Sequence, residues 1–72
     1  MAAQPVTPAA QKVLDGIVVD YHWEDNGFVT VTLSWAPARR RTVSVPAQEF
    51  TETTIRRLRE VTAVDVAEGR IK

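Results

Sequence analysis

The sequence predicts a small α+β domain in which an antiparallel β-meander packs against a helix. Residues 17–24 and 28–35 each alternate apolar and polar side chains, and Asp25-Asn26-Gly27 separates the two runs. Residues 41–45 continue the alternation, which is typical of half-buried strands. Residues 51–61 then begin with helix-starting residues and carry an apolar stripe at helical spacing.

The N-terminal part predicts one short helix ahead of the sheet. We assign the whole chain, 1–72, to a single domain because chains of this length rarely divide. Residues 1–6 are expected to be flexible. Thr7 is a favoured N-cap residue and Pro8 suits the first helical position. These two residues predict a helix over 8–14, which is too short to be stable unless it docks on the sheet.

Burial determines the register that we predict for the first hairpin. A two-residue Asn26-Gly27 turn would place the apolar side chains of the two strands on opposite faces. A three-residue loop with Gly27 in the left-handed conformation pairs Glu24 with Phe28 and gathers those side chains on one face. The resulting pairs are Trp23 with Val29, Tyr21 with Val31, Val19 with Leu33, and Ile17 with Trp35.

The second loop is expected to be longer. A five-residue loop over 36–40 would place Trp35 opposite Arg41, so that the guanidinium lies across the indole ring. Pro46 should end the third strand, because proline donates no hydrogen bond to the ladder. The remaining pairs in that register are Leu33 with Val43 and Val31 with Val45.

The C-terminal third predicts a helix followed by a fourth strand. Thr51 suits the N-cap of a helix over 51–61. Phe50 and Ile55 have the spacing of a hydrophobic staple across that N-cap. Alternating valines in residues 62–67 predict a strand. The expected order of elements is therefore helix, three strands, helix, strand.

The predicted apolar face is wider than one helix. Strands lie about 4.8 Å apart, so four of them span roughly 15–20 Å, whereas a helix is about 10 Å across. The N-terminal helix could cover part of the face. If it does not, Trp23 or Trp35 stays exposed, and large exposed apolar patches mark interfaces. We therefore predict a non-catalytic binding, adaptor or regulatory protein that contacts another protein or itself, as a homodimer. The expected partner-binding residues belong to types enriched at hot spots: Tyr21, Trp23, Trp35 and Arg41.

Composition restricts the setting and the ligands. Nine basic and nine acidic side chains give zero net charge, so no global field attracts nucleic acid or anionic lipid. There is no cysteine, which fits a reducing compartment. No apolar run of about 18 residues occurs, and residues 1–11 have neither the charge nor the apolar run of a secretory signal. We expect a cytoplasmic protein without membrane association.

The sequence contains few residues in patterns that indicate a catalytic or metal site. Asp20, His22 and Glu24 share one face of a strand, and such a row can bind a divalent metal or transfer protons. We interpret it as an ordinary solvated face, where such residues are common. The three glycines are scattered, so no phosphate-binding loop is predicted. We expect no enzymatic activity, no catalytic residue, no cofactor and no metal site.

Two arginine clusters suggest an alternative function, nucleic-acid binding. On a shared surface they would contact phosphates. The order helix, three strands, helix is similar to that of double-stranded-RNA-binding domains. The second helix lacks the lysine-rich start that those domains use on phosphates, and their glycine pattern is missing, so we assign the chain to no family. The arginines concerned are Arg39, Arg40 and Arg41 in the second loop and Arg56, Arg57 and Arg59 on the helix.

Overall fold

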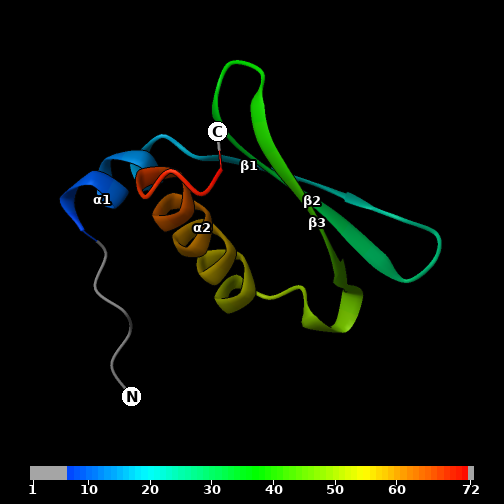
Figure 1. Ribbon diagram of the computed structural model, residues 1–72. Coiled ribbons are helices and arrows are strands. Elements are labelled where there is room, and N and C mark those ends of the chain that lie inside the picture. Colours follow the sequence, from blue (N-terminus) through cyan, green and yellow to red (C-terminus); the bar gives the residue numbers. More distant parts are fainter. Residues whose placement is uncertain (1–6, 72) are drawn as a thin grey trace.

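The computed structural model describes residues 7–71 and confirms the α+β class. Its strands form an antiparallel meander in the order β1-β2-β3. Figure 1 shows both helices on one side of the sheet, with the β1–β2 hairpin extending away from them. Residues 1–6, for which we expected flexibility, lie outside the described residues. The elements are α1 (Pro8–Asp15), β1 (Val18–Trp23), β2 (Phe28–Ala36), β3 (Arg39–Pro46), the short 3-10 helix η1 (Ala47–Glu49) and α2 (Glu52–Ala67).

The first hairpin has the predicted three-residue loop. The Glu24 N–H donates to the Phe28 carbonyl at 2.9 Å, and the Phe28 N–H donates to the Asn26 side-chain oxygen at 3.1 Å. Gly27 is left-handed, with φ +85°. The predicted pairs Trp23–Val29, Tyr21–Val31 and Val19–Leu33 are confirmed. The pair Ile17–Trp35 is not part of the ladder, which ends at Val18–Ser34.

The second hairpin is tighter than expected. Pro37 and Ala38 form a two-residue turn between Ala36 and Arg39, and a bulge follows at Ser34/Ala36. Ala38 has φ +62°, a conformation that favours glycine. The predicted five-residue loop is therefore three residues too long, and the predicted register is wrong by two residues because the bulge takes up the third. An even shift keeps each side chain on its predicted face. The observed pairs are Leu33 with Arg41, Val31 with Val43 and Val29 with Val45.

The predicted strand over 62–67 is wrong, because α2 continues to Ala67. No glycine or proline interrupts residues 52–68. The helix ends at Gly69, which has φ +77°. The Gly69 N–H donates to the Val66 carbonyl at 3.1 Å and the Arg70 N–H to the Asp65 carbonyl at 2.8 Å. This pair of bonds is a Schellman motif, in which glycine supplies the left-handed residue after the helix.

Threonine hydroxyls cap both helices as predicted. The Thr7 hydroxyl oxygen accepts the Ala10 N–H at 3.2 Å, and Pro8 occupies the first turn of α1. The Thr51 hydroxyl oxygen accepts the Thr54 N–H at 3.2 Å. Each bond satisfies one of the backbone donors that the start of a helix leaves unpaired.

The core lies between the centre of the sheet and the two helices. Val29, Val31 and Leu33 of β2 are fully buried. Small residues on the helices, Ala10 of α1 and Ala63 of α2, are buried against the same cluster. The helices therefore cover β2 more completely than β1 or β3.

Replacing Gly27 with alanine should destabilise the fold by about 1–2 kcal/mol, because alanine pays for the left-handed conformation. No atom lies within 4 Å of the position a Cβ would take, so crowding contributes nothing. Gly16→Ala is the control, since Gly16 has φ −98° and alanine meets only ordinary contacts there. Urea denaturation measures both. A Gly27→Ala variant as stable as the wild type would contradict the observed turn.

Candidate functional site: an exposed aromatic edge

Three aromatic side chains lie together where the helices stop covering the sheet. Tyr21 and Trp23 are 60% and 56% exposed, although they point to the same face as buried Val29 and Val31. The Phe50 ring lies between them: its centroid is 5.1 Å from that of Tyr21 and 5.3 Å from that of Trp23, the latter pair being T-shaped. We call Tyr21, Trp23 and Phe50 the aromatic edge. Such pairs hold each other in place, so the edge is a pre-arranged surface.

An open groove of about 370 Å³ adjoins the aromatic edge. Its walls include Tyr21, Phe50 and Ile55, with Arg56 and Arg59 of α2 beside them. The Arg59 guanidinium also donates to the Leu14 carbonyl at 3.3 Å. Because Leu14 lies in the last turn of α1, this bond places a cation at the negative end of that helix. Arg59 therefore joins the two helices and forms one wall of the groove.

The outer side of β1 has no strand beside it in the part of the chain that the structure describes. There, β1 has β2 as its one neighbour in the sheet. Glu24 and Phe28 are a hydrogen-bonded pair, and such pairs alternate with non-hydrogen-bonded ones along an antiparallel ladder. The N–H and C=O groups of Val19, Tyr21 and Trp23 therefore point away from β2. No other backbone group within residues 7–71 bonds to them.

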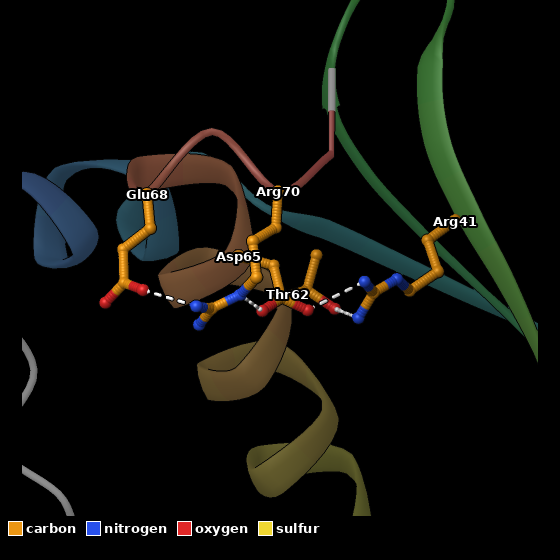
Figure 2. Close-up of polar contacts among 5 residues, drawn as sticks. All are labelled: Arg41, Thr62, Asp65, Glu68 and Arg70. Atoms are coloured by element: carbon orange, nitrogen blue, oxygen red, sulfur yellow. Dashed lines mark hydrogen bonds and ion pairs between the residues drawn. The ribbon is translucent and has the colours of Figure 1, made fainter.

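Two of the predicted partner-binding residues, Trp35 and Arg41, make contacts within the fold. Trp35 is half-buried and packs against the core. Arg41 does not cross the Trp35 ring. Its guanidinium donates to the Asp65 carboxylate at 2.8 Å and to the Thr62 hydroxyl at 3.3 Å, as Figure 2 shows. The tighter second turn explains this, because it moves Arg41 opposite Leu33. Tyr21 and Trp23 remain as predicted residues on an exposed surface.

The Arg41–Asp65 pair belongs to a small polar network between β3 and the end of α2 (Figure 2). Arg70 donates to the second Asp65 oxygen at 2.9 Å and pairs with Glu68 at 2.6 Å. Hydrogen bonds from Arg41, and then from Arg70, hold the pKa of the Asp65 carboxyl below its ordinary value of 3.8. The Asp65 and Arg41 side chains are only 17% and 26% exposed. The pair therefore anchors α2 on β3 and is partly shielded from solvent.

The two arginine clusters do not form one basic surface. Figure 1 shows the β2–β3 hairpin, next to Arg39 and Arg40, and the start of α2 at opposite ends of the molecule. Arg41 binds Asp65. Asp65 lies nine residues after Arg56 in α2, so about 14 Å of helix separates Arg56 from the residue that binds Arg41. Arg59 donates to Leu14. Exposed Arg57 stays a candidate phosphate contact, together with Arg39, Arg40 and Arg56.

The row of ionisable residues on β1 is a solvated face. His22 Nε2 lies 3.9 Å from Glu24 Oε1, and the Thr30 hydroxyl donates to the other Glu24 oxygen at 2.8 Å. Asp20 is exposed on the same strand. In the described part of the chain, no three His, Cys, Asp or Glu side chains converge to hold a metal ion.

Phe50 is the member of the aromatic edge that the sequence analysis assigned differently. Its place before Thr51 predicted a staple across the helix start. In the structure it lies where η1 leads into α2. Phe50 and Ile55 line the same groove, and the Phe50 ring also contacts Tyr21 and Trp23 of β1. The signal that could have found it is an aromatic residue in the short link between a strand end at Pro46 and a helix start. That link must return beneath the sheet.

Asp65→Asn should lower the free energy of unfolding by about 1–3 kcal/mol at neutral pH, because it leaves Arg41 without its charged partner. The lowered pKa of Asp65 means that this stabilisation is complete above pH of about 4 and is lost as the carboxyl protonates in the fold at lower pH. The wild-type and variant unfolding curves should therefore converge as the pH falls. Asp25→Asn, an exposed carboxyl in the first turn, is the control. If the wild type and Asp65→Asn differed in free energy of unfolding by the same amount at every pH, the Asp65 carboxylate would not be the stabilising partner of Arg41.

Within residues 7–71, no helix combines the length and apolar character needed to cross a membrane. No protein-family model, curated protein or solved structure matches this chain. We therefore infer its function from the geometry and exposure of the aromatic edge.

Proposed function

We propose that this chain is a non-catalytic binding or adaptor protein whose aromatic edge docks on another protein, in the cytoplasm. The observation that carries the proposal is the exposure of Tyr21 and Trp23 on the face that otherwise forms the core. Large aromatic side chains lose hydration on binding and have few rotamers to restrict, so they contribute heavily to protein interfaces.

The form of the site favours a macromolecular partner. The groove beside Phe50 is open to solvent. The aromatic edge extends this surface along β1 and does not close over the groove. Small-molecule sites bury most of the ligand surface in a cleft, whereas protein interfaces use apolar anchors within a polar rim. Glu52, Arg56 and Arg59 supply such a rim along α2.

The polar network supports the same proposal over nucleic-acid binding. Arg41 is neutralised by Asp65, and Arg59 is committed to the end of α1. Fewer arginines are then free for phosphate contacts, and a protein with zero net charge lacks the long-range attraction that dominates nucleic-acid affinity.

Trp23→Ser should abolish capture of the partner from a native lysate, because it removes the largest exposed aromatic anchor, 56% exposed, without disturbing the buried core. Val18→Ser is the matched control. Val18 is also exposed and apolar, on the same strand, but it points to the other face. The measurement is affinity capture followed by mass spectrometry, with and without nuclease treatment.

Two results would contradict the proposal. Capture that disappears on nuclease treatment, together with Arg39→Ala and Arg57→Ala variants that reproduce the loss, would make the chain a nucleic-acid-binding protein. Equal capture by Trp23→Ser and wild type would exclude the aromatic edge as the binding surface.

A further inference from the structure

The free edge of β1 can pair with the same strand of a second copy in only a few ways. Across a two-fold axis, hydrogen-bonded pairs must form between the outward-pointing residues Val19, Tyr21 and Trp23. When the axis passes between the two copies of Tyr21, Val19 of each chain lies opposite Trp23 of the other. In that arrangement every residue of β1 has a neighbour across the axis.

Charge selects this Tyr21-centred register. It places Asp20 of each chain opposite His22 of the second copy, at non-hydrogen-bonded positions, where side chains approach most closely. Symmetry makes the contact twice. A shift by two residues in one direction places Asp20 opposite Asp20, and a shift in the other direction places Asp20 opposite Glu24. Like charges directly opposite destabilise paired strands, so both neighbouring registers are disfavoured.

On the face that carries the helices, the two paired strands would contact each other through apolar side chains. The rings of Tyr21 from both copies would meet at the axis, and Val19 of the second copy would cover part of Trp23. These are the two most exposed aromatic side chains, at 60% and 56%. Pairing would therefore remove from water the apolar surface that the helices leave open.

The opposite edge of the sheet has features that hinder such pairing. The Ala47 N–H donates to the Gly27 carbonyl at 2.9 Å, which by alternation turns the backbone of Thr42, Ser44 and Pro46 outward. Pro46 has no N–H to donate, and β3 begins with three arginines. Proline and positive charge are common protections of edge strands. β1 has neither proline nor a basic residue other than His22.

We propose that this chain forms a homodimer in which β1 pairs antiparallel with β1 of a second copy, centred on Tyr21, so that one continuous sheet crosses the two-fold axis. The inference rests on the proposed function, because it names a second copy as one partner of the aromatic edge. Asp20 and His22, on the polar face of β1, set the register.

Charge variants on the polar face test the register. His22→Asp places a carboxylate opposite Asp20 twice and should raise the dimer dissociation constant about tenfold or more. Adding Asp20→Lys to His22→Asp replaces the like-charge pair with an opposite-charge pair and should return the constant toward that of the wild type. Ser44→Asp adds the same charge to the same face, on the far strand, and should have no effect. Sedimentation velocity over a concentration series measures all four proteins.

Backbone amide exchange tests the pairing without any substitution. The amides of Val19, Tyr21 and Trp23 should become slow to exchange, as followed by NMR, when the protein concentration rises through the dimerisation range. The amides of Thr42 and Ser44, at the other edge, should stay fast. The inference is overturned by a chain that is monomeric at every concentration, by equal weakening from Ser44→Asp, or by fast exchange at all three β1 amides in the dimer.

The capture experiment separates this inference from the proposed function. A monomer that still loses its captured partner through Trp23→Ser removes the homodimer and leaves the binding surface in place. A β1-paired dimer whose capture is unchanged by Trp23→Ser supports the homodimer and removes the adaptor function.

Discussion

The turn over Asp25–Gly27 determines which side chains can reach the core and which can reach a partner. Its bond from Glu24 to Phe28 and the left-handed Gly27 fix the register of the first two strands. Because side chains alternate between faces, a slip by one residue would move every apolar side chain of β1 to the polar face. The register places Tyr21 and Trp23 beside the buried valines of β2, on the face the helices occupy.

The helices then decide which part of that face stays open. Arg41 on β3 binds Asp65 and Thr62 on α2, so the later half of α2 is anchored towards the β3 side of the sheet. Arg59 holds the end of α1 against α2. With both helices tied in this way, β2 is buried and the distal part of β1 is not. The exposure of the aromatic edge therefore follows from the positions of the Arg41–Asp65 and Arg59–Leu14 contacts, which hold the helices in place.

Local chemistry was sufficient to predict much of this fold from the sequence. Period-two alternation located all three strands, threonines marked both helix starts, and burial chose the three-residue loop over the Asn-Gly turn. The fourth strand failed because Val64 and Val66 also suit a helix, and the deciding contact, from Asp65 to Arg41, joins residues distant in the sequence. The tight second turn failed because it needs Ala38 at φ +62°, which no local signal marks. The widths of sheet and helix predicted an exposed indole, Trp23 or Trp35, but only tertiary packing shows that Trp23 is the exposed one and that Tyr21 and Phe50 lie beside it.

The Trp23 indole lies outside the core although it shares the core-facing side of the sheet. A Trp35→Phe variant leaves Trp23 as the only indole, and its fluorescence in dilute solution measures this directly. The structure predicts red-shifted emission that acrylamide quenches efficiently and that unfolding in urea hardly moves. Blue-shifted emission that resists acrylamide until the protein unfolds would show that Trp23 is buried, and would contradict the aromatic edge.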